Sequence, residues 1–325
     1  MPMKALSAAN IALIKYWGNR NDALRLPVAD SLSITLDQPT VEIAGESADV
    51  FSVRSYEPDG SERKLTDKEI DRLQRHFEIS KQCLDLSEGI SLEIRSQIPP
   101  SIGFASSAAI FSSLAELYSG LSHRPVFPQQ KSIIARLGSG SAARSVFGGF
   151  MALRAGNGDT LDSSFVEQIA DSDHWRLWDI IIVPSHKEKK TGSTEGHARA
   201  HTSPLFEARI RSIPKRMEEC IDAILKKDFE KLQAVSEEDC MNMHAAMQSQ
   251  DPPLHYLSQE TYRLIDEVKE LRMREHLEVL FTMDAGPTVH LICTEAAFPE
   301  IRAFAKAQTN CTVFEAGIGS GSHLL

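Results

Sequence analysis

The spacing of apolar residues changes near residue 100. Residues 90–98 (ISLEIRSQI) alternate apolar and polar side chains, as a strand with one buried face does. After a proline pair and several small residues, apolar positions recur four, three and four apart, which places them on one helical face. These positions are Ile110, Leu114, Leu117 and Leu121. The pattern predicts a strand, a tight loop and a helix that begins at or beside Ser106 and Ser107.

Both strands and helices are predicted along the chain. Strands are expected at residues 5–14, 29–36, 150–156 and 178–184, and helices at residues 128–138 and over most of 205–275. A chain of 325 residues is long enough for two domains. We therefore predict an α/β protein with an N-terminal domain over residues 1–185 and a C-terminal domain over 186–325, because the composition changes after Pro184.

The last long apolar run contains a carboxylate. Residues 277–294 (LEVLFTMDAGPTVHLICT) read as a strand that breaks at residues 284–287 and then resumes. A carboxylate between two apolar strand halves costs free energy unless it is hydrogen-bonded or has a function. Asp284 is therefore a candidate for chemistry.

Composition narrows the classes of partner. The net charge of −10 argues against a nucleic-acid surface, so an anionic substrate would need a local group of cations. The five cysteines have no paired spacing, which is typical neither of a disulfide framework nor of a metal cluster. Neither a secretory signal nor a run of membrane-spanning length is evident. We expect a soluble cytoplasmic protein with no membrane or nucleic-acid partner.

Two clusters of small residues are candidate anion sites. The first turn of the helix at Ser106 has backbone N–H groups without an intrahelical partner, and these suit a phosphate. Gly103 and Ala105 keep the approach open, although a well-capped helix after a loop explains this stretch equally well. The second cluster is GSGSAARSVFGG, residues 138–149, where Arg144 offers a planar fork that can hold a carboxylate.

Two further segments have both a functional and a structural interpretation. Lys15, Tyr16 and Trp17 precede Gly18 at a turn, where such aromatics more often belong to the core than to a binding site. Residues 185–203 carry three lysines ahead of GSTEG, which fits a cationic loop that closes over an anion or a plain exposed loop.

The order of these segments resembles the diphosphomevalonate decarboxylase family of the GHMP kinase superfamily. The matching segments are NIALIKYWG, GFASSAA, GSGSAARSVFGGF, KKTGSTEG, MHA followed by PP, and FTMDAGP. The first small-residue loop matches the superfamily's ATP loop with Phe104 in place of leucine. The resemblance implies an N-terminal ribosomal-S5-like lobe, a C-terminal ferredoxin-like lobe and an active site in the cleft between them.

The same resemblance implies the reaction and the roles of residues. ATP with Mg²⁺ would phosphorylate the tertiary hydroxyl of mevalonate 5-diphosphate, after which phosphate and CO2 leave and isopentenyl diphosphate forms. Asp284 would accept the hydroxyl proton, Lys15 would keep it ionised, and Arg144 would hold the carboxylate. Substrate-binding residues would be Tyr16, Asn19, Arg20, Ser139, Ser141, Ser193 and Thr194; ATP-binding residues would be Pro99, Gly103, Ala105, Ser106 and Ser107, with Mg²⁺ reached by Ser107 through the ATP phosphates. Relatives of this kind are often homodimers.

Two departures from the family pattern bear on the substrate. The family's YWGK usually carries a lysine associated with the diphosphate, and this chain has Asn19, followed by Arg20 as a substitute. Where the family commonly has asparagine before serine, this chain has Asp30. An extra negative charge close to an anionic ligand is unfavourable. Either the substrate is less charged, such as mevalonate 5-phosphate, or Asp30 points elsewhere.

Two other functions remain as alternatives. A kinase of the same superfamily would phosphorylate a hydroxyl and stop, but it has no need of a carboxylate clamp such as Arg144. A non-catalytic relative would use the cleft only to bind a metabolite, which the presence of Lys15, Asp284 and Ser107 disfavours.

Overall fold

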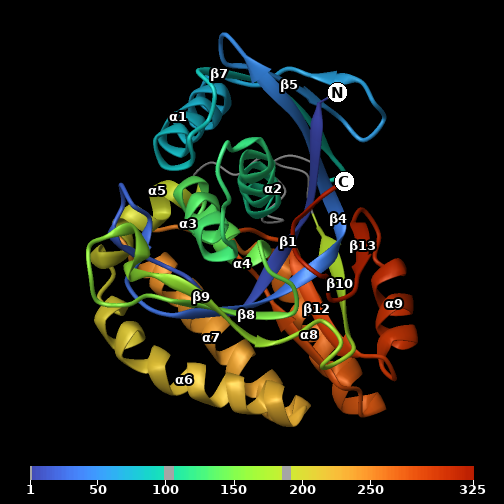
Figure 1. Cartoon of the computed structure of the whole chain (residues 1–325). Coiled ribbons are helices and arrows are strands. Elements are labelled where there is room, and N and C mark those ends of the chain that lie inside the picture. The colour runs from blue at the N-terminus through green and yellow to red at the C-terminus, as the bar shows by residue number, and fades with distance from the viewer. Residues whose placement is uncertain (1, 99–105, 185–191) are drawn as a thin grey trace.

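The computed structural model describes residues 2–98, 106–184 and 192–325. They form an α/β protein of two lobes, each built on its own sheet, with helices packed against both (Figure 1). No helix among these residues combines the length and apolar character needed to cross a membrane.

The sheet of the first lobe is organised around β1 and β4. Its strand order is β14-β1-β4-β7-β5-β6, with β8 beside β4 and β9 beside β8. Strand β4 is 18 residues long, so its first part pairs with β8, its second part pairs with β7, and β1 runs along both. The strands are β1 (Met3–Ile14), β4 (Ser31–Ala48), β5 (Ser52–Tyr56), β6 (Glu62–Arg63), β7 (Gly89–Ser96), β8 (Phe150–Arg154), β9 (Phe165–Ala170) and β14 (His323–Leu324). A separate hairpin joins β2 (Asn19–Asn21) to β3 (Leu26–Pro27).

The helices of the first lobe follow the predicted spacing. Helix α2 (Ser106–Leu121) lies against β1 and β4, where Ser112 bonds to Ser7 and Ser113 donates to the Val41 carbonyl. Helix α3 (Pro128–Gly138) begins and ends where the sequence predicts. The other two are α1 (Asp67–Leu84), whose first turn is capped by Thr66, and the short α4 (Ala142–Ser145).

The second lobe has a four-stranded antiparallel sheet in the order β11-β12-β10-β13. Its strands are β10 (Leu177–Val183), β11 (Val279–Thr282), β12 (Val289–Thr294) and β13 (Thr312–Ala316); its helices are α5 (Ser193–Arg199), α6 (Phe206–Lys226), α7 (Phe229–Ser249), α8 (Gln259–Glu275) and α9 (Phe298–Lys306). The division of the chain at residues 185 and 186 stays a prediction, and strand β10, which precedes it, belongs to this second sheet.

The segment around Asp284 differs from the expected interrupted strand. Strand β12 does not continue β11 but turns back antiparallel to it, so that Thr282 pairs with His290. Asp284 therefore lies in the loop of a hairpin. This placement lets its carboxylate leave the sheet without disturbing the hydrogen bonds of either strand.

The end of the chain returns to the first lobe. Strand β14 pairs with the start of β1, and the Gly319 N–H donates to the Thr35 carbonyl at 2.8 Å. Figure 1 shows both termini at this side of the molecule. The glycine-rich tail thus adds the strand beside the start of β1 and begins no helix.

His76 makes the core of the first lobe sensitive to acid. Its ring is buried against Phe111, its Nε2 lies 2.9 Å from the Ile134 carbonyl, and burial lowers its pKa to about 4. Since the unfolded chain binds this proton near pH 6.5, the stabilisation is complete above pH 6.5 and is lost as the pH falls toward 4. We expect the free energy of unfolding to lose about 1.4 kcal/mol per pH unit from this group.

Urea denaturation between pH 7 and 5 measures this dependence. His76→Gln should make the slope of unfolding free energy against pH shallower, whereas the exposed His123→Gln should leave it unchanged. Equal slopes in wild type and His76→Gln would contradict the assignment.

Candidate active site

A cleft that is partly open to solvent lies where the two lobes meet. The first lobe contributes the end of β1, the β2–β3 turn, the start of α2 and the region from residue 139 to α4. The second lobe contributes α5, α7 and the β11–β12 loop. Nine of the residues predicted from the sequence line this cleft: Lys15, Tyr16, Ser107, Ser139, Ser141, Arg144, Ser193, Thr194 and Asp284.

Lys15 and Asp284 join the two lobes through an ion pair. Lys15 Nζ lies 2.7 Å from Asp284 Oδ1, with the lysine side chain 1% exposed and the aspartate side chain 26% exposed. Burial by itself raises the pKa of the Asp284 carboxyl, but the charge and hydrogen bond of Lys15, with help from Arg144, hold it below its usual value. Asp284 is therefore an anion at neutral pH and lines the cleft.

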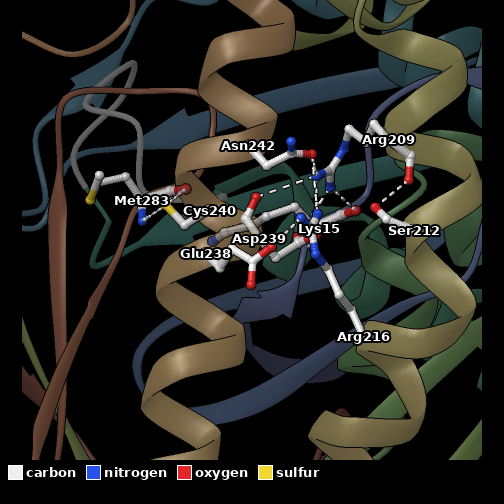
Figure 2. Close-up of polar contacts among 9 residues, drawn as sticks. All are labelled: Lys15, Arg209, Ser212, Arg216, Glu238, Asp239, Cys240, Asn242 and Met283. Carbon is white, nitrogen blue, oxygen red and sulfur yellow. Dashed lines mark hydrogen bonds and ion pairs between the residues drawn. The ribbon is translucent and has the colours of Figure 1, made fainter.

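A buried ionic network fixes the backbone of Lys15 (Figure 2). Asp239 Oδ2 accepts the Lys15 N–H at 2.7 Å, and Arg209 Nη2 donates to the Lys15 carbonyl at 3.1 Å. Asp239 is wholly buried and also pairs with Arg209 and Arg216, so one carboxylate ties helices α6 and α7 to the end of β1. No pattern in the sequence predicted this network, which fixes the position of the backbone that carries the Lys15 side chain.

The Arg144 guanidinium is held by three hydrogen bonds and also lines the cleft. Its Nε, Nη1 and Nη2 donate to Ser33, Ser31 and Asn10 at 2.8, 2.7 and 3.1 Å. A guanidinium carries five N–H groups, so two remain for a ligand. Burial lowers its pKa to about 10, which still leaves it a cation at neutral pH. The arrangement can hold a carboxylate in a fixed orientation.

Three serine hydroxyls form a chain along one wall. Ser107 Oγ lies 3.1 Å from Ser139 Oγ, which lies 3.2 Å from Ser141 Oγ. Ser107 stands in the first turn of α2, so the chain connects the predicted ATP site to the predicted substrate site. Ser106 begins the helix but does not line the cleft. The predicted residues Pro99, Gly103 and Ala105, and the lysines of residues 187–190, lie outside the described residues.

Tyr16 and His197 line the cleft side by side. Their ring centroids are 4.3 Å apart, and His197 Nδ1 accepts the Gly18 N–H. Burial raises the pKa of Tyr16 to about 12 and lowers that of His197 to about 3, so both are neutral at pH 7. A Cβ at position 140 would lie 2.4 Å from the Tyr16 ring, so Gly140 is needed for the ring to occupy this place.

Two residues assigned to the substrate are engaged by other partners. Asn19 accepts a hydrogen bond from the Tyr16 hydroxyl and donates to Asp22, while Arg20 donates to the backbone carbonyls of Pro27 and Gly158. Neither lines the cleft. Their role in binding phosphate therefore stays a prediction, and this geometry does not support it. Residue spacing could not show this, since it does not determine the direction of side chains at a turn.

The sequence left open whether the Asp30 carboxylate lies close to the substrate or points elsewhere. It does not line the cleft. Its carboxylate accepts hydrogen bonds from Arg154 Nη1 at 2.9 Å and from the Ala155 N–H at 2.8 Å. The negative charge is therefore paired at the end of β8. It does not oppose an anion in the cleft.

The cleft contains a cation that the sequence analysis missed. Arg25, in the turn between β2 and β3, lines it beside Tyr16 and Gly140. Arg25 belongs to a turn of ordinary polar composition, so no pattern in the sequence indicated a binding role for it. The described lining residues thus include Lys15, Arg25 and Arg144 against the single carboxylate Asp284. This is the local group of cations that an anionic substrate needs in a chain of net charge −10.

Comparison with known proteins gives one family over almost the whole chain. Residues 7–165 match the family described as diphosphomevalonate decarboxylase-like N-terminal domain, and residues 179–316 match the mevalonate 5-diphosphate decarboxylase C-terminal domain. The diphosphomevalonate decarboxylase of Candida albicans is 36% identical over 304 residues, covering 88% of this chain and 83% of that protein. That of Danio rerio is 34% identical over 327 residues, covering 95% and 81%.

Solved structures agree with the sequence relatives. Mevalonate diphosphate decarboxylase from Staphylococcus aureus superposes with a TM-score of 0.90 at 28% identity, covering all of this chain and 98% of the other. A complex of MDDEF with MVAPP, AMPPCP and magnesium gives the same TM-score and identity, covering 100% and 99%. The predicted two-lobed α/β fold is thereby confirmed. The chain belongs to the diphosphomevalonate decarboxylase family of the GHMP kinase superfamily.

Proposed function

We propose that this protein catalyses the ATP-dependent decarboxylation of mevalonate 5-diphosphate to isopentenyl diphosphate, releasing ADP, phosphate and CO2. The observation that carries the proposal is the convergence of the Lys15–Asp284 pair and Arg144 on one cleft. The MDDEF complex with MVAPP, AMPPCP and magnesium supports the pairing of this substrate with ATP.

The first step transfers the terminal phosphoryl group of ATP to the tertiary hydroxyl. The hydroxyl oxygen attacks phosphorus, the bond to ADP breaks, and the proton passes to Asp284. A carboxylate whose pKa is held low is a weak base, so its main work is to orient the hydroxyl and to receive the proton late. This suits phosphoryl transfer, whose loose transition state demands little prior deprotonation. Lys15 offsets charge on the moving group.

The second step depends on how the carboxylate is held. The bond between C3 and the phosphate oxygen breaks, and the electrons of the bond to the carboxylate carbon form the new double bond as CO2 leaves. Arg144, fixed by Asn10, Ser31 and Ser33, would hold the carboxylate so that the breaking bond is aligned with the developing cation.

The donors in the cleft suit a magnesium ion carried by ATP. Mg²⁺ prefers oxygen ligands and is usually bound through one or two protein oxygens plus phosphates. Ser107 and Asp284 supply such oxygens, and the described residues contain no group of three or more His, Cys, Asp or Glu that would bind a metal independently. When bound, Mg²⁺ neutralises charge on the transferring phosphoryl group.

A second candidate substrate is mevalonate 5-phosphate. Asn19 stands where the family usually has a lysine associated with the diphosphate, and an amide cannot neutralise a phosphate charge. The chemistry at Asp284, Lys15 and Arg144 would be the same. The two proposals therefore differ only in the number of phosphates that the cleft receives.

One assay tests these proposals together. Purified protein is offered mevalonate, its 5-phosphate and its 5-diphosphate with ATP and Mg²⁺, and ADP and CO2 are both measured. We expect equal amounts of ADP and CO2 with the diphosphate. ADP without CO2 would mean a kinase, and release of neither product would mean a non-catalytic relative.

Replacing Arg144 should weaken turnover more than nucleotide binding. Arg144→Gln removes a charge-assisted contact worth roughly 1.5–3 kcal/mol, so we expect kcat to fall by about 10–100-fold while the affinity for ATP changes less than twofold. Steady-state kinetics and a titration with ATP measure the two effects. An unchanged kcat would move the carboxylate clamp to another residue.

The assembly and location are proposed from the family resemblance. We propose a homodimer in the cytoplasm. Light scattering of the purified protein tests the dimer, and fractionation of the source cells tests the location.

A further inference from the structure

The β2–β3 turn brings a cation of its own to the cleft. Arg25 lines the cleft together with Tyr16 and His197, and its Nε donates to the Leu137 carbonyl, two residues before Ser139 on the same wall. Its charge acts on Tyr16 and His197, and also on Arg72 and His76 of helix α1.

The environment of Arg25 leaves most of its guanidinium for a ligand. Its Nε donates to the Leu137 carbonyl at 3.0 Å, near the end of α3. Among the described residues, its two terminal nitrogens have no hydrogen-bond partner and no carboxylate pairs with it. A cation that is held by one nitrogen and lacks a counter-charge, in a protein of net charge −10, is suited to an anionic ligand.

The backbone at Arg25 is restrained. Arg25 has φ +48°, a left-handed conformation that residues other than glycine adopt at a cost in free energy. The Asp22–Arg25 turn joins two very short strands, and Leu26 beyond it is fully buried. The side chain that lines the cleft thus starts from a backbone position with little freedom.

The other arginines assigned to the site are already engaged. The Arg20 guanidinium donates to the carbonyls of Pro27 and Gly158. Arg144 donates to Ser33, Ser31 and Asn10, and its remaining N–H groups are assigned to the substrate carboxylate. Asn19 holds the Tyr16 hydroxyl. Among the described lining residues, Arg25 is thus the cation left for a phosphate.

We propose that Arg25 binds the terminal phosphate of the substrate and sets the preference for a diphosphate over a monophosphate. The proposal rests on the proposed function for the identity of the substrate. It assigns to the β2–β3 turn the charge that Asn19 does not supply. Arg25 is a binding residue, distinct from the groups that move the proton and the phosphoryl group.

The test compares kcat/KM for mevalonate 5-diphosphate with that for the 5-phosphate. Arg25→Gln keeps a non-glycine residue at the left-handed position, so the backbone cost is unchanged and only the charge is lost. We expect the ratio of diphosphate to monophosphate use to fall at least 10-fold, through KM for the diphosphate, with KM for ATP within twofold of wild type. Arg25→Lys should recover part of the ratio.

Arg75→Gln is the matched control, since it removes one positive charge from an exposed site on α1. It should leave the ratio unchanged. An Arg25→Gln ratio within twofold of wild type would overturn the proposal.

A binding measurement separates this proposal from the proposed function. Inorganic pyrophosphate is titrated calorimetrically into wild type and Arg25→Gln without ATP. If wild type turned over neither mevalonate derivative, the proposed function would fail, yet a 10-fold loss of pyrophosphate affinity in Arg25→Gln would still support Arg25 as the phosphate contact. Equal affinities would overturn it.

Discussion

Asp284→Asn is expected to lower the rate of ADP formation by about 10²–10⁴-fold, the range that general acid–base groups contribute. The amide cannot accept the hydroxyl proton, and it leaves Lys15 without its ion-pair partner. Binding of ATP should persist, because the predicted nucleotide site at α2 belongs to the other lobe. A coupled ADP assay and a titration with ATP measure the two effects.

The control is Glu295→Gln, which changes an exposed carboxylate just beyond β12 that pairs with Arg176. Its rate should equal that of wild type. Retention of most of the rate in Asp284→Asn would remove Asp284 from its role and leave the ion pair as a contact between lobes.

Asp239→Asn is expected to reduce the free energy of unfolding by about 3–5 kcal/mol, the usual result of breaking a buried ion pair by removing one partner. Arg209 and Arg216 would lose the carboxylate that both share. Because Asp239 also accepts the Lys15 N–H, kcat should fall at temperatures where the variant remains folded, with KM for ATP nearly unchanged. Urea denaturation and steady-state kinetics give the two values.

Glu238→Gln is a matched control for this network. Glu238 is the neighbouring residue on α7 and also pairs with Arg216, but its side chain is 68% exposed. An exposed pair is worth about 0–1 kcal/mol, so stability and kcat should change little. If Asp239→Asn lost stability but kept its full kcat, the network would hold the lobes together without positioning Lys15.

The sequence was sufficient for the elements whose residues are local in the chain. Helices α2 and α3 have apolar periodicity and clear boundaries, and both appear where predicted. We could predict that Lys15, Arg144 and Asp284 share one site only because short segments of the chain resemble one family in their order. Without that resemblance, nothing in the spacing of three residues from three distant segments would have brought them together.

What the sequence could not predict depends on side-chain direction and long-range pairing. Arg20 and Arg25 stand five residues apart around one turn, yet of the two only Arg25 lines the cleft, while Arg20 donates to the carbonyls of Pro27 and Gly158. The role of Asp239 needs contacts with residues 23, 30 and 224 positions away. Apolar spacing alone also does not distinguish a strand that continues after Asp284 from one that turns back.

The pairing of β14 with β1 bears on the order in which the first sheet can form during synthesis. Ala5 and Leu6 pair with Leu324 and His323, so these two positions at the start of β1 stay unpaired on that side until both lobes have been translated. An open strand edge offers its backbone groups to other chains. A fragment of the first lobe expressed without β14 would keep the edge at Ala5 and Leu6 exposed.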